Sequence, residues 1–342
     1  MNVRMKDIAK DLGISVITVS KALRNHPDVA KETRERILKR VQELDYQPNM
    51  LARSLVTGHS YLIGLVVPGL MHPFFAEIAS SLSAVVGRSG YSVILSSSEQ
   101  DPQLEERQIR HLLARRLDAL AVATSGLSTG IFEQINRAGM PYVLIDQELP
   151  GLAANFVGMD DVEIGRMATE HLIEQGCRRI AHLKGKNSIT GIRRYEGYRK
   201  ALERHGMEYD ESLVIACAKT DTDHLSEGAE AMKQLLRLPQ RPDALFCYND
   251  SLAIDAMNVI SAAGLSIPEE IAVIGCGNLY YDESLRVPLS SIDQNSKSIG
   301  EKTAEILLDL IDTKNSAHTR SVILTPQILV RASSQRKALS GK

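Results

Sequence analysis

An alternation of apolar runs with amphipathic stretches, which begins at Tyr61, is the feature that most constrains the fold of this chain. Eight runs have the length and apolar character of buried strands, and they occupy residues 62–67, 91–96, 118–123, 141–146, 155–158, 179–183, 243–248 and 271–275. Helical spacing of apolar residues predicts helices over residues 74–88, 102–116, 129–138, 161–175, 193–205, 224–237, 251–263 and 296–312. Each strand with its helix takes about 25–30 residues, as in doubly wound α/β sheets with right-handed crossovers. The pattern predicts an α/β body with enough units for two parallel sheets.

Residues 1–46 show a different pattern, in which three short helices are predicted and no run resembles a strand. Apolar residues at helical spacing place these helices over residues 5–12, 16–24 and 31–44. Pro48 ends this run, and a further short helix is predicted over 49–58, with Gly58 at its end. The chain is therefore predicted to have an all-α head and an α/β body.

Three residues of the head stand where a helix-turn-helix requires them. Ala9 is small enough for two helices to pack closely, Gly13 suits a left-handed turn, and Val19 can be buried in the second helix. Ser15, just before that helix, is a good residue to cap it. Because a helix-turn-helix places its second helix in the major groove, the head is predicted to bind double-stranded DNA.

The distribution of charge agrees with a nucleic-acid partner for the head. Residues 1–58 carry a net charge of +4 and the remaining residues −6, which together give the net −2 of the chain. A basic head favours contact with an anionic polymer. The sequence contains neither a secretory signal nor an apolar run of about 20 residues, so we expect a cytoplasmic protein that does not enter a membrane.

Sequence motifs of the common enzyme and metal classes are missing. The chain has no GxSxG, no phosphate loop and no GxGxxG after a strand. The four cysteines form no CxxC or Cys/His cluster, and they are Cys177, Cys217, Cys247 and Cys276. We therefore expect a binding protein rather than an enzyme, with no metal, no cofactor and no disulfide framework.

The head and several blocks of the body resemble one known family. The segment DIAKDLGISVITVSKALRNHPDVAKETRERILKRVQELDYQPNMLARSL resembles the head of the lactose-repressor (LacI/GalR) family almost position by position. The blocks VGMDD, GYRKAL, CYNDSLAIDAM, PEEIAVIG and VPLSSIDQ are also similar to those of the family. The resemblance implies a transcription regulator, most often a repressor, that binds a palindromic operator as a homodimer. It also implies allosteric control by a small-molecule effector, such as a sugar, a sugar derivative or another metabolite.

The same resemblance implies a domain organisation in which a two-lobed periplasmic-binding-protein-like body follows the head. We expect the chain to cross between the lobes three times, near 159–160, 290–292 and 321–325. The expected parts are a helix-turn-helix domain at 1–46, a hinge helix and linker at 47–60, an N-terminal lobe at 61–159 plus 292–321, a C-terminal lobe at 160–291 plus 322–334, and a tail at 335–342.

By this resemblance, residues 16–24 form the recognition helix. Val16 and Ile17 occupy the positions that set operator choice, and because both are apolar they favour contacts with thymine methyl groups. Lys21 can reach a guanine or a phosphate. The other residues that are expected to contact DNA do so at its sugar-phosphate backbone, where they position the protein. They are Ser15, Thr18, Ser20, Asn25 and His26. For the polar positions the alternative is a solvated helix face. Arg4 stands where the family usually has a capping Thr or Ser, so the first turn is expected to be looser.

The segment 49–58 resembles the hinge helix of the family. Leu55 matches the leucine that wedges into the minor groove and kinks the duplex, and Asn49, Ala52 and Arg53 flank it on the DNA side. A helix this short is marginal in water because its nucleation is costly. We therefore expect it to form only when it is paired with its dimer mate on DNA. The alternative for Leu55 is a place in linker packing.

Polar and aromatic residues at the ends of predicted strands suggest an effector site between the lobes. Arg194 matches the family arginine that reaches the ligand, and its fixed fork of donors suits hydroxyl, carboxylate or phosphate groups. The other candidates are His72, Phe74, Phe75, Asp146, Asn249, Asp250 and Gln294. Each of them can alternatively be a satisfied polar or packing group between lobes.

Two departures from the family pattern bear on which effector is bound. Gly277 stands where the family commonly has an Asp, so an acceptor for sugar hydroxyls is missing. The position that often carries an aromatic residue is near Asp223. Both departures argue against a standard neutral hexose or pentose, although Tyr280, Tyr281 or Asp282 can compensate.

Three other functions are compatible with parts of this sequence. A transport-type sugar-binding protein would share the body but not the DNA-binding head. An enzyme is possible on such a fold, because fold alone does not decide function, but the sequence has no catalytic motif. A nonspecific nucleic-acid-binding protein would leave the two-lobed body unexplained. The comparison favours a regulator.

Overall fold

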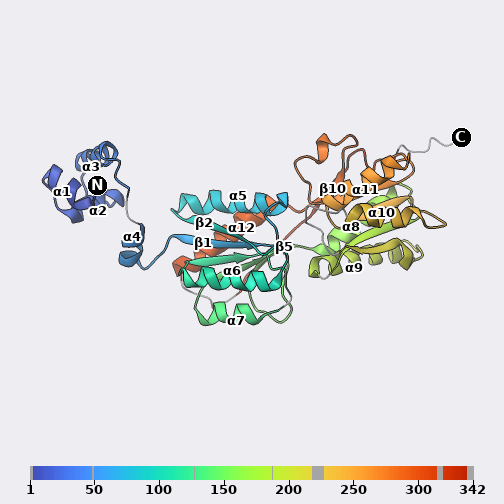
Figure 1. The fold of residues 1–342 in the computed structure, drawn as a ribbon, viewed down its shortest axis with the longest axis horizontal. Helices are drawn as coiled ribbons and strands as arrows, with labels where there is room; N and C mark the ends of the chain where they lie inside the picture. The colour runs from blue at the N-terminus through green and yellow to red at the C-terminus, as the bar shows by residue number, and fades with distance from the viewer. Residues whose placement is uncertain are drawn as a thin grey trace. The chain divides into compact units, whose positions relative to one another are not determined.

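The fold was examined in a computed structural model, which describes residues 3–47, 50–126, 128–186, 188–217, 227–313 and 319–336. The chain divides into two units, Met1–Ser60 and Tyr61–Lys342 (Figure 1). The boundary coincides with the change in sequence pattern at Tyr61. Across the described residues, the structure contains no helix that combines the length and the apolar character needed to span a bilayer.

The first unit consists of four helices, α1 (Met5–Leu12), α2 (Val16–Leu23), α3 (Lys31–Glu43) and α4 (Met50–Thr57). The carboxylate of Asp7 accepts from the backbone N–H of Arg4 at 2.9 Å, which closes the first turn without a capping hydroxyl. Gly13 ends α1 with φ 66°, in the left-handed region. Ser15 Oγ then caps α2 by accepting from Thr18 N at 3.0 Å.

The helices α1, α2 and α3 enclose a small core of their own. Its buried residues are Ile8, Ala9, Val19, Ala22, Val29, Ile37 and Tyr46. Ala9 and Val19 are both in this core, and Gly13 makes the turn between their helices, as the helix-turn-helix spacing predicts. The sequence prediction of an all-α helix-turn-helix head is therefore confirmed.

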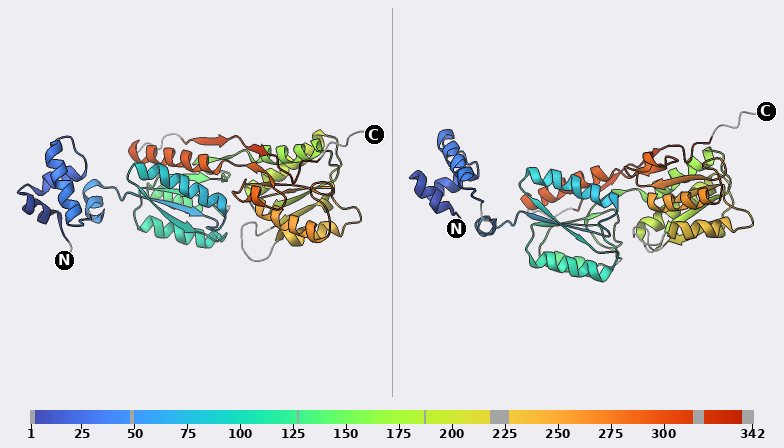
Figure 2. Two further views of the ribbon diagram at one scale, coloured as in Figure 1. Left: turned by 90° about the horizontal axis from the view of Figure 1, so that it is seen from above. Right: turned by 45° about the horizontal axis from the view of Figure 1, so that its top comes forward.

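The second unit contains two six-stranded sheets. The first sheet has the order β11-β5-β4-β3-β1-β2, and all of its neighbouring strands are parallel. Its strands are β1 (Leu62–Val67), β2 (Ser92–Ser97), β3 (Ala119–Val122), β4 (Tyr142–Ile145), β5 (Asn155–Met159) and β11 (Ser321–Leu324). Its helices are α5 (Pro73–Arg88), α6 (Pro102–Ala114), α7 (Gly130–Arg137) and α12 (Ser296–Thr313). Helices α5 and α12 cover one face and α6 and α7 the other, which the right panel of Figure 2 also shows.

The second sheet has the order β12-β10-β9-β8-β6-β7, with β12 antiparallel to β10. Its strands are β6 (Ile180–Gly185), β7 (Val214–Cys217), β8 (Ala244–Cys247), β9 (Ala272–Cys276), β10 (Ser290–Asp293) and β12 (Gln327–Leu329). Its helices are α8 (Asp161–Glu174), α9 (Ile189–Arg204), α10 (Glu227–Leu236) and α11 (Asp250–Ala262). Alternate residues of β8 pack on opposite faces, because Phe246 joins the core under α8 and α9 while Leu245 joins the core under α10 and α11.

The chain passes between the sheets after β5, after β10 and after β11. Strand β10 belongs to the second sheet through Asp293, and β11 belongs to the first sheet through Leu324. The second crossing follows Asp293, directly after the expected range 290–292, and the third follows Leu324, within the expected range 321–325.

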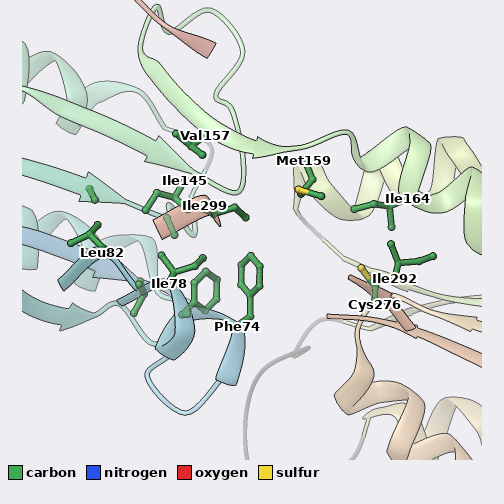
Figure 3. Packing of buried hydrophobic residues seen from close by; sticks show 14 of the residues in the cluster. Phe74, Ile78, Leu82, Ile145, Val157, Met159, Ile164, Cys276, Ile292 and Ile299 are labelled. Atoms are coloured by element: carbon green, nitrogen blue, oxygen red, sulfur yellow. The ribbon is translucent and has the colours of Figure 1, made fainter. Parts of the chain in front are cut away.

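One apolar cluster continues through both lobes of the body. Its first-lobe part includes residues of α5, α12, β4 and β5, and its second-lobe part includes residues of α8, β9 and β10. In Figure 3, Met159 lies between the two groups of labelled side chains, with Phe74, Ile78 and Ile145 on one side and Ile164, Cys276 and Ile292 on the other. The strand ends that carry polar residues therefore lie beside a shared apolar core.

Candidate DNA-binding and effector sites

The outer surface of α2 carries two exposed apolar side chains. Val16 is 42% exposed and Ile17 is 68% exposed, while Val19 and Ala22 of the same helix are buried. Helical geometry separates the buried and the exposed residues onto different faces. An isolated head therefore presents Val16 and Ile17 to solvent, where they have no packing role.

The polar candidates of the head surround this apolar pair. Ser15 Oγ and Thr18 Oγ1 are 2.9 Å apart, so the two hydroxyls share a hydrogen bond at the start of α2. Lys21 Nζ donates to Asp28 Oδ2 at 2.8 Å, and this hydrogen bond is the largest influence that lowers the pKa of Asp28. His26 Nδ1 accepts from the backbone N–H of Asp28 at 3.3 Å.

Ser20 and Asn25 contribute mainly through their backbone. The Ser20 carbonyl accepts from Arg24 Nε at 3.3 Å at the end of α2. Asn25 follows with φ 55°, a left-handed conformation that Asn tolerates better than most residues. These two residues therefore set how the chain leaves α2.

Helix α4 carries a second exposed apolar pair, Leu55 and Val56, with exposed fractions of 89% and 80%. Thr57 Oγ1 donates to the Arg53 carbonyl at 3.0 Å, and Gly58 N donates to the Ser54 carbonyl at 2.8 Å. The predicted hinge residue Asn49 and the side chain of Ala52 lie outside the described residues.

The helical state of α4 differs from the expectation that this segment folds only with a dimer mate on DNA. Residues 50–57 are helical in a single chain. Hydrogen bonds to the carbonyls of Arg53 and Ser54 satisfy backbone groups that a short helix otherwise leaves to solvent. A local C-terminal cap therefore offsets part of the cost of nucleation.

In the body, Arg194 of α9 is the most strongly held candidate, with 2% of its surface exposed. Its Nε donates to Asp161 Oδ1 at 2.8 Å, its Nη1 donates to the Tyr248 carbonyl at 2.6 Å, and its Nη2 donates to Gln294 Oε1 at 2.7 Å. The guanidinium also lies 4.6 Å from the centre of the Tyr248 ring. Burial is the largest influence on the pKa of Arg194 and lowers it, yet Asp161 and other neighbouring groups hold this pKa well above its ordinary value.

The partners of Arg194 include two residues that the sequence prediction missed. Asp161 starts α8 directly after the crossover from β5, and Tyr248 follows β8. Both belong to blocks that carried the family resemblance, VGMDD and CYND, so their position in those blocks was the available signal. Gln294, which was predicted, joins them from the crossover that follows β10.

The candidates from the first lobe start at the end of β1. His72 caps α5, because its Nδ1 accepts from Phe74 N at 3.3 Å. Phe74 and Phe75 are buried, with their ring centres 5.0 Å apart. In this conformation the two aromatic side chains pack in the apolar core, so a ligand could stack on them only after a rearrangement.

Asp146, Asn249 and Asp250 follow the ends of strands β4 and β8. Asp146 has φ 70° and is half-buried. Asn249 caps α11 by accepting from Leu252 N at 3.0 Å. The Asp250 side chain is wholly buried, and its carboxylate accepts from Ser291 Oγ at 2.7 Å and from Leu279 N at 3.3 Å.

Gly277 lies directly beside the Asp250 carboxylate. A Cβ atom at position 277 would lie 2.7 Å from Asp250 Oδ2, and the backbone of Gly277 has φ 143°. An aspartate at this position would therefore meet both backbone strain and a second carboxylate. Asp223, the other position where the chain departs from the family pattern, lies outside the described residues.

Candidates from both lobes lie close enough for their charges to act on one another. Burial is the largest influence on the pKa of the Cys276 thiol at the end of β9 and raises it. The charge of Arg194 lowers this pKa, and the charges of Asp250, Asp161 and Asp146 raise it. Burial raises the pKa of the Asp250 carboxyl, and the hydrogen bond from Ser291 acts to lower it. Within the described ranges, no group of three or more His, Cys, Asp or Glu side chains could hold a metal ion.

Comparisons with known proteins agree for both units. Residues 4–49 match the family described as bacterial regulatory proteins, lacI family, and residues 60–333 match periplasmic binding proteins and sugar binding domain of LacI family. The chain is 32% identical over 335 residues to the HTH-type transcriptional repressor PurR of Haemophilus influenzae (strain PittEE), which covers 96% of this chain and 98% of that protein.

Solved structures resemble the whole chain as well. The transcriptional regulator CelR in complex with cellobiose is 28% identical, with a TM-score of 0.73 over 97% of this chain and 99% of the other. The Lac repressor dimer bound to operator and the anti-inducer ONPF is 24% identical, with a TM-score of 0.85 over 98% of this chain and 100% of the other. At that identity the second likeness concerns the fold.

Proposed function

The chain belongs to the LacI family of bacterial regulatory proteins, and from this premise we propose that it represses transcription as an effector-controlled homodimer on a palindromic operator. The observation that carries the DNA-binding part is the exposed apolar pair Val16 and Ile17 on a recognition helix whose opposite face is fully packed. Val16 and Ile17 would contact thymine methyl groups in the major groove, because they offer no hydrogen bonds to base edges.

Positioning on the DNA falls to the polar residues around that pair. Ser15, Thr18 and Lys21 would contact phosphates, with Lys21 exchanging Asp28 for a phosphate oxygen. Leu55 would insert into the minor groove, since it is the most exposed large apolar side chain among the described residues. Arg53 would lie beside it on the DNA backbone. Two copies of the head then read two half-sites.

The effector site would lie between the lobes at the carboxyl ends of the strands, with His72, Asp146, Arg194, Asn249 and Gln294 as its expected residues. Arg194 is held by Asp161 and Tyr248 of the second lobe and by Gln294 of the crossover, so a ligand that offers its own acceptor can compete with Gln294 for the guanidinium. The complex of CelR with cellobiose supports a sugar or sugar derivative as the class to test first. The absence of a carboxylate at position 277 favours a ligand different from a simple hexose.

Selection of binding sites from a random DNA library with the purified full chain tests this proposal. We expect an inverted repeat to emerge, bound by two chains, with an affinity at least about 10³-fold above that for random DNA. A selected sequence without two-fold symmetry, or binding that depends on salt and not on sequence, would refute the proposal.

A further inference from the structure

A hydrogen bond joins Gln147 of the first lobe to the start of helix α9 of the second lobe. The Gln147 side chain is buried, and its Oε1 accepts from the backbone N–H of Ile189, the first residue of α9, at 3.3 Å. Its Nε2 donates to the Thr124 carbonyl at 2.8 Å. The two partners fix the orientation of the amide, because a flipped amide would place its NH₂ against an N–H and its oxygen against a carbonyl. Gln147 is therefore engaged at both ends, once in each lobe.

The turn that precedes Gln147 is strained. Asp146 has φ 70°, and Gln147 N donates to the carbonyl of Ile145, two residues earlier, at 2.8 Å. A three-residue turn with a positive φ at its centre is rare in proteins. Strained backbone persists where the surrounding structure fixes it, and it is concentrated at functional sites. The strain indicates that the course of the chain after β4 is functionally important.

A buried polar network supports Gln147 from within its own lobe. The carboxylate of Glu105 in α6 is buried and accepts from Thr124 Oγ1 at 2.6 Å, from Ser125 N at 2.6 Å and from Ser125 Oγ at 2.7 Å. These three bonds hold the segment after β3, and the Thr124 carbonyl of this segment accepts from Gln147. The network therefore runs from α6 through the carboxyl ends of β3 and β4 to the start of α9.

Two further contacts join the same parts of the lobes. The Ile189 side chain packs against the apolar core that α6 and α7 cover in the first lobe. Arg193 Nη2 lies 3.7 Å from Glu148 Oε2, the residue after Gln147. The first two turns of α9 are therefore in contact with the first lobe, and Arg194 follows directly on this helix.

We propose that Gln147 is a positioning residue, which ties the start of α9 to the carboxyl ends of β3 and β4 and thereby sets how the two lobes meet. Because Arg194 follows Ile189 on the same helix, the tie also sets where its guanidinium stands relative to the first lobe. The consequence for ligand binding rests on the proposed function. An effector that favours another arrangement of the lobes must break the bond between Gln147 and Ile189, whereas an effector that favours this arrangement keeps it.

Hydrogen exchange of the full chain, resolved to single amides by mass spectrometry, tests the tie without DNA or effector. Gln147→Met keeps the length of the side chain but offers no acceptor, so exchange at the Ile189 amide should rise by roughly two- to tenfold, the scale of one hydrogen bond. Glu148→Gln removes only the exposed ion pair with Arg193 and should leave this amide within about twofold of wild type. The proposal is overturned if Gln147→Met raises exchange at residues 125–126 but not at Ile189, because Gln147 then supports only its own lobe.

Proline at position 189 removes the N–H group itself. The first residue of a helix accepts proline, and Ser188 before it has φ −118° and ψ 146°, which suits the residue before a proline. Ile189→Ala is the matched control, because it removes the side chain and keeps the N–H.

Cross-linking across the lobes compares these two backgrounds. Cysteines replace Glu148 and Arg193, whose side chains are partly exposed, and a short bis-maleimide joins them within one chain. The four native cysteines are buried, so they should react slowly. Gln147→Met should slow cross-linking by roughly two- to tenfold in the Ile189→Ala background and leave it unchanged in the Ile189→Pro background, where the bond is already missing. An equal effect of Gln147→Met in both backgrounds would overturn the proposal.

Discussion

Arg194 and Asp161 form the ion pair on which the second lobe most depends. Their side chains are 3% and 5% exposed, and Nε of Arg194 lies 2.8 Å from Oδ1 of Asp161. A buried pair contributes little relative to an apolar pair, but removal of one partner leaves a charge without compensation. The pair therefore couples the start of α8 to α9 and fixes the position of the guanidinium.

Replacement of Arg194 by alanine should lower the free energy of unfolding of the body by about 3–5 kcal/mol, because the Asp161 carboxylate is left buried and unpaired. Urea denaturation followed by circular dichroism measures this loss. The matched control is Arg193→Ala, whose side chain is 45% exposed and lies 3.7 Å from Glu148, and it should cost less than about 1 kcal/mol. Equal losses in the two variants would contradict the role given to the buried pair.

Single-residue expectations from the sequence succeeded where local pattern decides the outcome. The burial of Ala9 and Val19 and the left-handed turn at Gly13 follow from spacing within one short motif. The pairing of Arg194 with Asp161 could not be predicted in this way. Asp161 lies 33 positions away in the sequence, and the two side chains meet only when α8 packs on α9. The burial of Phe74 likewise depends on packing between distant elements.

Helix α4 is the element that should convert DNA contact into a bend. It presents Leu55 and Val56 to solvent, although exposed apolar pairs on a free helix cost solubility and give no packing. Such a pair is useful only if a partner covers it. The minor groove and the second copy of the helix are the partners in our proposal.

Leu55→Ala should weaken binding to the selected operator by more than tenfold, since a wedge that unstacks one base step is worth on the order of a few kcal/mol. Binding to random DNA should remain unchanged because it depends on phosphate contacts. Gel-shift titration of both DNAs measures the two affinities. Specific affinity within a factor of about two of wild type would remove Leu55 from the wedge position.

Helix α2 should set which operator is chosen. Val16→Ser with Ile17→Gln should change the sequence recovered from a random library while leaving the stability of the head within about 0.5 kcal/mol, because both side chains are exposed. Val19→Ser, at a buried position of the same helix, should instead unfold the head. Recovery of the wild-type operator by the double variant would place specificity elsewhere.

Most elements of the body followed from the sequence, since all eight predicted strands are present within one or two residues. The strands β7, β10, β11 and β12 were not predicted, and each has only three or four residues. Such strands carry too few residues for a clear apolar pattern, and their pairing is decided by the sheet that they join. Helix α9 starts at Ile189, four residues before the predicted 193, because Ser188 caps it.

At the scale of the whole molecule, a helix-turn-helix head precedes a body with two sheets and three crossings. Three short connections link the lobes, and the effector candidates lie beside them, Asp161 after the first crossing and Gln294 at the second. A ligand can change operator affinity only to the extent that it binds two arrangements of the lobes with different affinity. Effector control of operator binding therefore requires such a difference in affinity.

The proposed coupling between effector binding and operator binding can be tested by measuring each affinity in the presence and absence of the other ligand. A thermal-shift screen of the full chain against saccharides, beginning with cellobiose, and against other small metabolites identifies a ligand. Operator affinity is then titrated with and without that ligand, and ligand affinity with and without operator. The account predicts that both affinities change by the same factor, roughly 5- to 150-fold, because coupling between two sites is reciprocal. A ligand that binds the body but leaves operator affinity unchanged would contradict the account.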